Sequence, residues 1–538
     1  MKEKTLHSTH ILMFPFVFNE EPKIINEALV ENSLWTYIPF DISKSQQNYN
    51  EYIYFYEYVR KALYSNKSMD EKQTSYYFEY KEQKGTYELE VNDKKYKLDI
   101  DGISMRTFDT NVGILSIELS NYEYRDPESI LVINDFARRL YPQFLAGKNN
   151  LEYVKNNLLP QSVTLYLSEK IEEDYSYYED MKNIQKDATN LPNFIHALLG
   201  DKFTSHSNDN KIHIEPIIDD RMFVVSMYMH DDIVEEMKKY DEDKNAYAYE
   251  NDDFWYKYIF VDAGDKMCQN KHMTKNLIKE TTYERWIEWG TLFGISRYSF
   301  VALTGQWFGE NRLKPHMHTM YFQIFTLLLA YRASMLNFSK RVADVSVGDR
   351  GVQELQAEVT AIYKDYINFQ NNLFFRELTA QEQGIELYNQ ALKVMQTEKH
   401  IKDLDNEIAE LHTYVSMKMQ EEESKKAEDR EKQLATISKL GALFLPPTVI
   451  AGILGMNTIN FAKNDDGMYW GGALIVLSVL FGFGVIKKGW TKYISIGLLT
   501  VILVISLFFM PMATESRVDK TKNHIKTKET KDVNKSNG

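Results

Sequence analysis

The chain has 538 residues, a formal net charge of −14 and a single cysteine, Cys268. This length predicts more than one structural unit, with ample material for a buried core. The acidic balance argues against a binder of nucleic-acid duplexes, which needs a basic face. A lone cysteine permits no internal disulfide, so we expect the main domain to lie in a reducing compartment.

Residues 1–280 combine short apolar or alternating segments with amphipathic ones. The segments that we expect to form strands are 11–18, 87–91, 95–100, 112–119, 163–167 and 222–228. The segments that we expect to form helices are 50–65, 128–141 and 233–239. Because these elements do not alternate with regular βαβ spacing, we predict an α+β domain over residues 1–280.

Strand signals fade after this point, and residues 281–380 are predicted to be helical. Apolar faces at helical spacing occur over 283–303, 316–342 and 352–378. The second of these contains 321–336, a run that is apolar enough to suggest a membrane span, but Gln323 and Arg332 interrupt it. We therefore expect a buried helix there rather than a span.

Residues 381–435 carry a heptad pattern that is typical of a long packed helix. Its apolar positions are Leu387, Val394, Ile401, Ile408 and Val415, with Leu404 and Leu411 between them. Neither proline nor glycine occurs from 385 to 440. The pattern predicts one stalk helix from Gln381 to Met456, on the order of 110 Å long at 1.5 Å per residue.

Residues 436–513 form the predicted membrane region, with apolar runs at 440–456, 468–486 and 493–511. Lysines and arginines flank the first two runs on the side of the N-terminal domain, which predicts that this domain is cytoplasmic. We expect a multi-pass protein of the cell membrane with three spans, followed by a disordered basic tail at 514–538.

The first apolar run contains Pro446 and closes with Gly455-Met456-Asn457. Together with the second run close behind it, the stretch from 432 to 490 resembles the CorA family of divalent-cation channels. The resemblance implies a funnel-shaped homopentamer in which a stalk helix continues into a pore. It also implies Mg²⁺ as the transported ion, with Asn457 holding the hydrated ion through its water.

A stripe of small and polar residues leads back from Asn457 in steps of three to five. Its members are Gly452, Thr448, Leu445, Gly441 and Ser438, and Gly455 and Met456 complete the proposed pore segment. Leu445 would form an apolar ring that gates by dewetting. Family members have an acidic loop after the pore, and here Asp465 and Asp466 would supply the acids. The alternative is an anchoring helix whose small residues pack against a neighbour.

Cationic and aromatic residues concentrate between 285 and 314. The set consists of Arg285, Trp286, Arg297, Tyr298, Arg312 and Lys314. Such residues suit a nucleotide, by phosphate pairing and base stacking, although packing at a domain junction would use the same residues. His316 and His318 are interpreted as ordinary histidines rather than metal ligands. Asp219-Asp220-Arg221 would form an internal salt bridge in preference to a cation site.

A second resemblance rests on the segments DDRMFVVSMY, FVDAGDKMCQN and YERWIEWGTLFGISRYS. They look like the enlarged cytosolic domains of CorA-like proteins associated with type III CRISPR systems. That resemblance implies an antiviral membrane effector opened by a nucleotide messenger, S-adenosylmethionine joined to AMP.

The resemblance, together with these patterns, implies a ligand-gated, CorA-like cation channel in which residues 1–280 act as a cytosolic sensor. Alternatives from other classes are a non-conducting, membrane-anchored binding protein and a membrane-tethered enzyme acting on a nucleotide. Enzyme motifs such as GxxxxGK, HExxH, GxSxG and paired CxxC do not occur, so we expect no catalysis.

Overall fold

The computed structural model describes residues 4–141, 159–175, 191–205, 211–347, 351–455 and 476. The chain consists of two compact units, Met1–Ser416 and Met417–Gly538.

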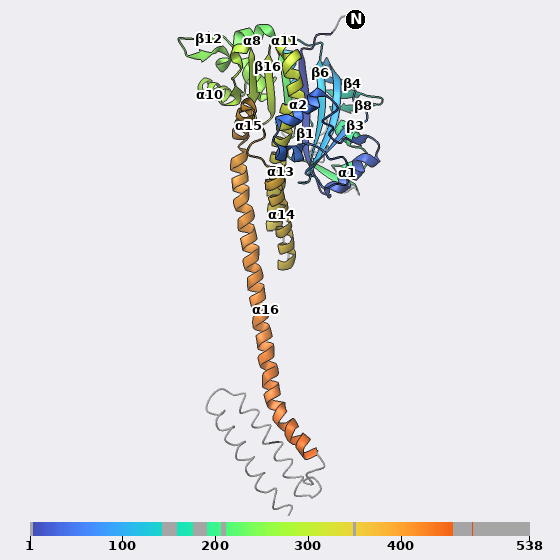
Figure 1. Ribbon diagram of the computed structural model, residues 1–538, viewed down its shortest axis with the longest axis vertical. Helices are drawn as coiled ribbons and strands as arrows, with labels where there is room; N and C mark the ends of the chain where they lie inside the picture. The colour runs from blue at the N-terminus through green and yellow to red at the C-terminus, as the bar shows by residue number, and fades with distance from the viewer. Residues whose placement is uncertain are drawn as a thin grey trace, which may run out of the picture. The chain divides into compact units, whose positions relative to one another are not determined.

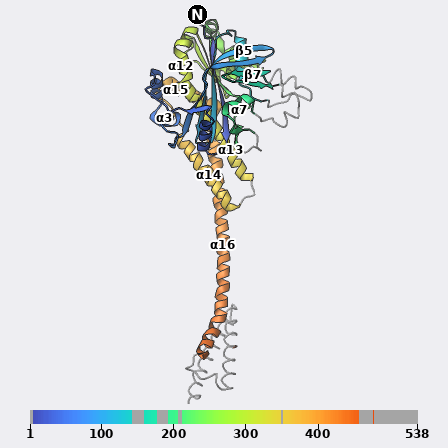
Figure 2. The same ribbon diagram turned by 90° about the vertical axis from the view of Figure 1, so that its right-hand side faces the viewer.

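Within the described residues of the first unit, one sheet contains 14 strands (Figures 1 and 2). Along its main path the order is β14-β15-β16-β11-β1-β6-β5-β4-β7-β8, while β10 pairs with β1, β9 with β10, β3 with β5 and β2 with β3. The pairs β11–β16 and β9–β10 are parallel, and the other pairs in this sheet are antiparallel. The strand bounds are β1 Ser8–Phe18, β2 Trp35–Tyr37, β3 Ser75–Tyr80, β4 Gly85–Val91, β5 Lys94–Phe108, β6 Val112–Asn121, β7 Ser162–Tyr166, β8 Lys170–Asp174, β9 Phe203–Thr204, β10 Ile212–Pro216, β11 Phe223–Met229, β14 Thr282–Tyr283, β15 Thr291–Ile295 and β16 Ser299–Thr304. A separate pair joins β12 (Tyr240–Asp241) to β13 (Ala246–Tyr247).

The central strand β1 explains why the sheet is covered on both faces. All of its 11 residues are buried. Ile11 and Met13 pack with the long helices of one face, whereas Leu12 and Phe14 pack in the core of the other face. Successive side chains of a strand point to opposite faces, so a continuous apolar run requires two covering layers.

One covering layer contains α1 (Pro22–Glu31), α4 (Pro127–Ala137), α7 (Asn193–Leu199) and α9 (Asp253–Phe260). Helix α4 starts at a strong sequence signal, because the Asp126 carboxylate accepts a hydrogen bond from the Ser129 N–H and Pro127 occupies the first turn. The remaining short helices of the unit are α2 Gln46–Tyr54, α3 Glu57–Leu63, α8 Asp231–Met237, α10 Lys271–Thr281, α11 Gln306–Phe308 and α12 Lys314–His318, with one-turn segments η3 Ala248–Asn251, η4 Ile287–Trp289 and η5 Gly309–Leu313.

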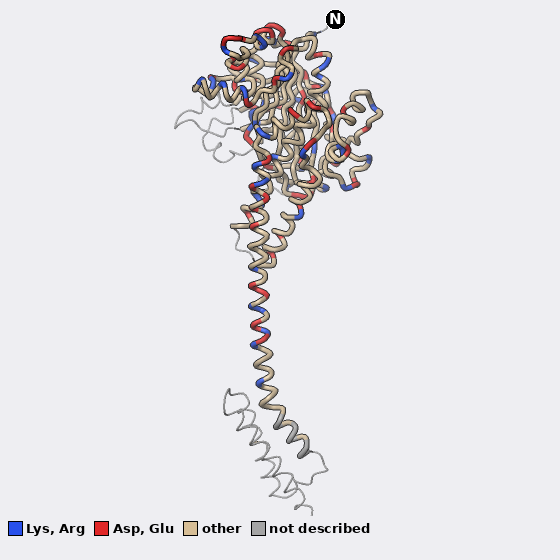
Figure 3. The backbone as a smooth tube through the Cα atoms, turned by 60° about the vertical axis from the view of Figure 1, so that its left-hand side comes forward, with Lys and Arg blue, Asp and Glu red and all other residues tan. Residues whose placement is uncertain are grey.

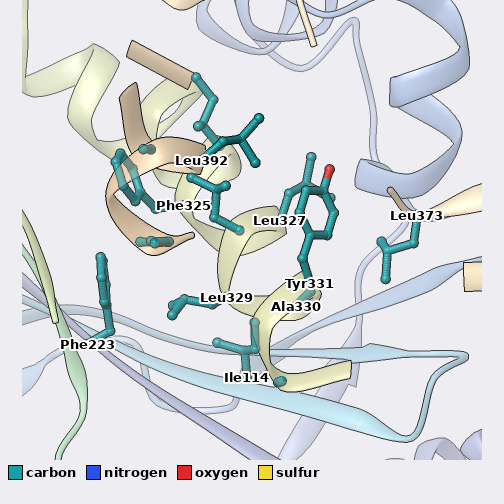
Figure 4. Close-up of a cluster of buried hydrophobic side chains, with 14 of the residues drawn as sticks. Ile114, Phe223, Phe325, Leu327, Leu329, Ala330, Tyr331, Leu373 and Leu392 are labelled. Atoms are coloured by element: carbon teal, nitrogen blue, oxygen red, sulfur yellow. The ribbon is translucent and has the colours of Figure 1, made fainter. Parts of the chain in front are cut away.

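The opposite layer is built on α13 (Met320–Val347), α14 (Val352–Asn372) and α15 (Glu382–Met395). Figure 4 shows residues of α13 between Ile114 and Phe223 of the sheet and Leu373 and Leu392 of the neighbouring helical segments. The side chains of Phe325, Leu327 and Leu329 are fully buried. The prediction of a buried helix in this region is confirmed.

The prediction of a helix over 283–303 is wrong. The segment forms β14, η4, β15 and β16, and β16 adds to β11 in parallel. A short, continuous apolar run fits a buried strand or a buried helix equally well, so pairing with β11 decides the outcome. Gly290 adopts a φ of 74°, a conformation that closes the turn before β15 and that other residues rarely adopt.

The expected single helix from Gln381 to Met456 is divided at Gln396. Helix α15 ends there, because Gln396 has a φ of 55° and its N–H bonds back to Leu392 and Lys393. Helix α16 then runs from Thr397 to Gly455. The heptad residues Leu387, Ile401, Leu404, Ile408 and Val415 are buried in the core formed with α13 and α14, and Val394 and Leu411 are partly buried. The packing seam that the heptads predict is confirmed.

In the second unit, α16 carries ion pairs and then exposed apolar residues. Lys425 bonds Glu421 at 2.6 Å, Lys426 bonds Glu422 at 2.5 Å and Lys432 bonds Glu428 at 2.9 Å. Figure 3 shows these charges giving way to uncharged residues toward Gly455. Exposed large apolar side chains follow at Leu434, Ile437, Leu440, Phe444 and Leu445.

A search of the described residues finds no helix with the length and apolar character that a membrane crossing requires. Residues 440–455 of the first expected run form the C-terminal end of α16, and Met456 lies outside the described residues. The runs at 468–486 and 493–511 also lie outside them, apart from Val476. The tail at 514–538 lies outside them as well.

Candidate functional site

The six residues that the sequence suggested for a nucleotide do not form one cluster. Arg285 and Trp286 precede β15, whereas Arg297 and Tyr298 form the turn between β15 and β16. The strands are antiparallel, with Thr291 opposite Thr304 and Ile295 opposite Phe300, so the two pairs lie at opposite ends of the hairpin. The other two, Arg312 and Lys314, belong to the helical turns that follow β16.

Arg285 contacts carboxylates of the protein itself. Its Nη1 lies 2.6 Å from Glu386 Oε1 and its Nη2 lies 3.1 Å from Glu382 Oε2, both on α15. Its guanidinium also stacks 5.6 Å from the centre of the Trp286 ring. This end of the hairpin therefore holds two layers of the domain together.

The other end of the hairpin brings arginines from distant segments around Tyr298. The guanidinium carbon of Arg138 lies 5.9 Å from the Tyr298 ring centre, and that of Arg221 lies 5.8 Å from it. Arg332 of α13 donates through Nη1 to the carbonyl oxygen of Arg297 at 2.6 Å. We call Arg138, Arg139, Arg221, Arg297 and Arg332 the arginine cluster.

Backbone pairing positions the first three members. Arg138 caps the C-terminus of α4, and its carbonyl accepts from the Met222 N–H at 2.7 Å. Arg139 forms an isolated bridge with Arg221, just before β11 begins. The end of a helix and the entry to a central strand thus present arginines on one side of Tyr298.

Three aspartates offset part of this positive charge. Asp135 Oδ2 accepts from Arg139 Nη2 at 2.7 Å and from the Ala263 N–H at 3.0 Å. The carboxylates of Asp219 and Asp220 lie 3.4 Å and 3.2 Å from Arg221 Nε, which confirms the expected internal salt bridge. A fourth carboxylate, that of Asp262, lies close enough for Asp135 and Arg139 to affect its pKa.

The surroundings of Asp219 and Asp220 shift their pKa values in opposite directions. Burial, followed by the neighbouring Asp219, raises the pKa of Asp220 to about 7. Burial is also the main opposing influence on Asp219, whose pKa nonetheless stays below its usual value because of hydrogen bonds from Asp220 and the charge of Arg221.

Arg138 provides the most specific sign of a ligand. Its exposed fraction is 2%. Its Nη2 donates to the Val261 carbonyl at 3.0 Å and lies 3.7 Å from Asp135 Oδ1, but Nε and Nη1 have no hydrogen-bond acceptor among the described residues. Buried donors without partners are rare because each costs free energy. A carboxylate or phosphate binds a guanidinium by two parallel hydrogen bonds and would satisfy such donors.

The cluster lies beside the start of α16. Burial is the largest cause of the lowered pKa of His400, and the charges of Arg297 and Arg332 come next. His400 belongs to the first turn of α16, so an anion that neutralises these arginines changes the field at that turn. The site thus adjoins a β-hairpin, the helix α13 and the helix α16.

The predicted histidines have ordinary surroundings. Both lie in or at the end of α12, and His318 Nδ1 lies 2.7 Å from Glu118 Oε2. The His316 ring lies edge-on to Tyr321 at 6.2 Å. No group of three or more metal-binding side chains occurs in the part of the chain that the structure describes.

The predicted pore stripe lies on the last turns of α16. Ser438, Gly441, Leu445, Thr448 and Gly452 are all exposed. Gly455 is the last residue of the helix, while Met456, Asn457, Asp465 and Asp466 lie outside the described residues.

Sequence reasoning named Arg297 and Tyr298 but missed Arg138, Arg139 and Arg332. The available signal was an arginine pair at the end of the predicted helix 128–141, followed far along the chain by Asp219-Asp220-Arg221. Nothing in the sequence indicates that these segments meet, because the bridge between Arg139 and Arg221 joins residues distant in the chain.

One comparison with known proteins gives a match. Residues 323–488 match the family model described as CorA-like Mg²⁺ transporter protein. The matched range begins in α13, includes α14, α15 and α16, and contains Arg332 of the arginine cluster. No curated protein and no solved structure matches the chain. The match associates the C-terminal helices with divalent-cation transport and leaves the large sheet of the first unit outside it.

Proposed function

We propose that this protein is a divalent-cation channel of the CorA-like kind, carrying Mg²⁺ and gated by an anionic ligand at the arginine cluster. The observation that carries the proposal is the family match over 323–488, which includes both Arg332 of the cluster and the whole of α16. One continuous helix therefore begins beside the ligand site and ends at the segment that we assign to the pore.

Conduction is assigned to the C-terminal turns of α16 in a homo-oligomer, with a pentamer as the expected assembly. The exposed apolar residues from Leu434 to Leu445 support self-association, because a helix with such a face needs a covering surface. The stripe from Ser438 to Gly452 would line the pore, with Leu445 as an apolar constriction. At its end, Gly455, Met456 and Asn457 would form the outer mouth.

A ring of Asn457 amide oxygens would hold Mg²⁺ through its hydration water, since Mg²⁺ prefers oxygen ligands and dehydrates reluctantly. Asp465 and Asp466 would raise the local concentration of cations. The proposal places three spans, at 440–456, 468–486 and 493–511, in the cell membrane, with the N-terminal domain in the cytoplasm.

The ligand is assigned to the class of phosphate-bearing nucleotides. Guanidinium forks pair with phosphate, and an aromatic ring beside them, such as that of Tyr298, is a residue type that stacks on bases. A second candidate function, suggested by the resemblance of the cytosolic segments, is an antiviral effector of type III CRISPR opened by S-adenosylmethionine joined to AMP. Both functions use the same pore and differ in whether opening supplies the cell with Mg²⁺ or disturbs its ion balance.

The test of the conduction assignment compares Asn457→Ala with Asn460→Ala, a matched change three residues away. We expect Mg²⁺ entry into proteoliposomes, reported by a trapped fluorescent indicator, to change in rate or ion selectivity only in the first variant. Equal fluxes in both variants and wild type would contradict the assignment, and the absence of flux in all three would favour a non-conducting anchored protein.

A further inference from the structure

A cavity of about 750 Å³ is lined by the large sheet and by helices α13 and α14. Its walls come from segments that are far apart in the chain: the segment between β1 and α1, the segment before β3, the turn between β5 and β6, strand β10 and the two helices. Small-molecule sites in proteins have volumes of about 300 to 1,000 Å³. The cavity shares no residue with the arginine cluster, so it is a separate place for a ligand.

The turn between β5 and β6 presents Asp109 at the wall of this cavity. Asn337 Nδ2 of α13 donates to the carbonyl oxygen of Thr110 at 3.2 Å. Asn111 Nδ2, in the same turn, donates to the carbonyl oxygen of Glu20 at 2.8 Å. Hydrogen bonds to two separate segments hold the backbone beside Asp109 in place, so little conformational freedom is lost when a ligand binds there.

The carboxyl group of Asp109 has no ion-pair partner in the described part of the chain. Burial raises its pKa to about 7, with Lys72 acting in the opposite direction and Asp365 adding to the rise. Among the residues that the structure describes, its carboxyl oxygens form no hydrogen bond with another side chain. A buried carboxylate without such partners is costly to keep ionised. A cation bound in the cavity would offset that cost.

The other charged groups of the cavity fall into a paired and an unpaired set. Glu215 contacts Lys340 and lies 3.1 Å from Nε2 of His213. Asp365 Oδ2 lies 2.8 Å from Arg341 Nη2. The lining groups that form no ion pair with a described residue are the carboxyl groups of Glu20, Glu21, Asp109 and Asp344 and the ammonium groups of Lys72 and Lys364. Unpaired carboxyl groups thus outnumber unpaired ammonium groups, which favours a positively charged ligand.

We propose that this cavity is a binding site for a linear di- or polyamine, with one ammonium group of the ligand paired with Asp109. The unpaired carboxyl groups come from three different segments, and no group of three or more metal-binding side chains occurs within the described ranges. A chelated metal ion needs several ligands that converge on one point, whereas an alkyl polyamine carries its charges at intervals along a flexible chain. The side-chain oxygens of Asn19 and Asn368 line the same cavity and can accept hydrogen bonds from the other N–H groups of the ligand.

The test measures binding of putrescine to the full-length protein in detergent by isothermal titration calorimetry, so it does not depend on conduction. Asp109→Asn is the variant, and Asp243→Asn, at an exposed position outside the cavity, is the matched control. At pH 8 we expect Asp109→Asn to weaken putrescine binding by tenfold or more and the control to leave it unchanged. Asp344→Asn, a second change within the cavity, should also weaken binding.

The pH dependence of binding identifies the carboxyl group that holds the ligand. Asp109 pairs with an ammonium group only when it is ionised, and its pKa of about 7 leaves about one tenth of it ionised at pH 6. The affinity of wild type should therefore fall about tenfold from pH 8 to pH 6, because alkyl amines such as that of lysine stay protonated at both. His213 faces the same cavity, and the variant separates the two groups. Asp109→Asn should bind putrescine with the same low affinity at pH 8 and pH 6.

Thermal unfolding without putrescine shows whether Asp109 serves the fold instead. Asp109→Asn should unfold at the temperature of wild type or a higher one, because a neutral amide replaces a carboxyl group that is costly to bury. A lower unfolding temperature together with equal affinities for putrescine in the variant and wild type would overturn the proposal. The absence of binding to wild type at both pH values would overturn it as well. So would loss of wild-type binding in millimolar Mg²⁺, which would reveal a general attraction for cations.

Discussion

The sharpest prediction concerns Arg138, because a structural residue and a ligand-binding residue respond to substitution in opposite ways. In the change Arg138→Met, an unbranched apolar side chain of similar length replaces a buried guanidinium. If Arg138 serves the fold, its removal destabilises the protein. If Arg138 instead serves to bind an anion, its removal stabilises the ligand-free protein.

The magnitude follows from the surroundings of the guanidinium. Burial lowers the pKa of Arg138 from 12.5 to about 10, which corresponds to a cost of about 3 kcal/mol for keeping the charge at neutral pH. The substitution removes this cost but also removes the hydrogen bond to the Val261 carbonyl, worth about 1.5 kcal/mol. The substitution also breaks the ion pair between Arg138 Nη2 and Asp135 Oδ1, 3.7 Å apart, but the lowered pKa of Arg138 already includes that attraction. Asp135 keeps Arg139 and the Ala263 N–H as partners. We therefore expect the free energy of unfolding to rise by about 1 to 2 kcal/mol.

The assay is thermal unfolding of the full-length protein in detergent, followed by tryptophan fluorescence, together with equilibrium binding of ATP. Arg125→Met is the matched control, because the Arg125 side chain is exposed and its Nη2 forms a solvent-exposed ion pair, at 3.8 Å, with Asp232 Oδ2. We expect Arg138→Met to raise the unfolding temperature and to weaken ATP binding, while the control changes neither. A fall in unfolding free energy of 2 kcal/mol or more, with ATP binding retained, would refute the reasoning.

Two further predictions test the core and the stalk. His10 is fully buried, with Nδ1 at 2.6 Å from Asn134 Oδ1, and burial lowers its pKa from 6.5 to about 4. The unfolded chain therefore takes up a proton on this histidine at a higher pH than the folded chain does. As the pH falls from 6.5 to 4, the free energy of unfolding, measured in urea, should fall by about 3 kcal/mol more for wild type than for His10→Asn. Parallel pH profiles for the two proteins would contradict this. Ile408 is 1% exposed, and Ile408→Ala should lower the free energy of unfolding by about 2 to 5 kcal/mol. Ile437 is 63% exposed, and Ile437→Ala should leave the unfolding of the first unit unchanged. The second variant should instead shift the mass measured by light scattering toward smaller assemblies. An unchanged mass for the second variant would count against self-association along this face.

The parts of the fold that could be predicted from the sequence are those with a long, unambiguous pattern. The strand from 11 to 18 appears as β1, extended to Ser8, and the apolar segment within 316–342 appears as the buried α13. The heptad positions from Leu387 to Val415 lie in the packed seam. The heptads have a period that matches the face that the helix buries, whereas β1 and the first half of α13 are continuous apolar runs that are buried on all sides.

The errors have equally local causes. Residues 283–303 form strands because β16 pairs in parallel with β11, and no local sequence signal indicates that pairing. Gln396 interrupts the stalk in a left-handed conformation that is typical of glycine or asparagine, so its sequence predicts a continuous helix.

The candidate site was predicted only in part for a different reason. Tyr298 and Arg297 sit in one turn, and an aromatic residue beside a basic one is visible in the sequence. Arg138 comes from the end of α4 and Arg332 from the middle of α13, and only the folded sheet brings them to that turn. A site assembled from residues far apart in the chain has no characteristic sequence spacing from which it could be predicted.

The central claim is that an anion at the arginine cluster opens a Mg²⁺ pathway through α16. The most direct measurement is Mg²⁺ flux into proteoliposomes carrying wild type or Arg221→Met, with ATP, AMP or the S-adenosylmethionine–AMP conjugate on the side of the N-terminal domain. We expect at least one of these nucleotides to raise the flux of wild type by tenfold or more and to leave the flux of Arg221→Met unchanged. Flux that is equal with and without every nucleotide, in both proteins, would contradict it.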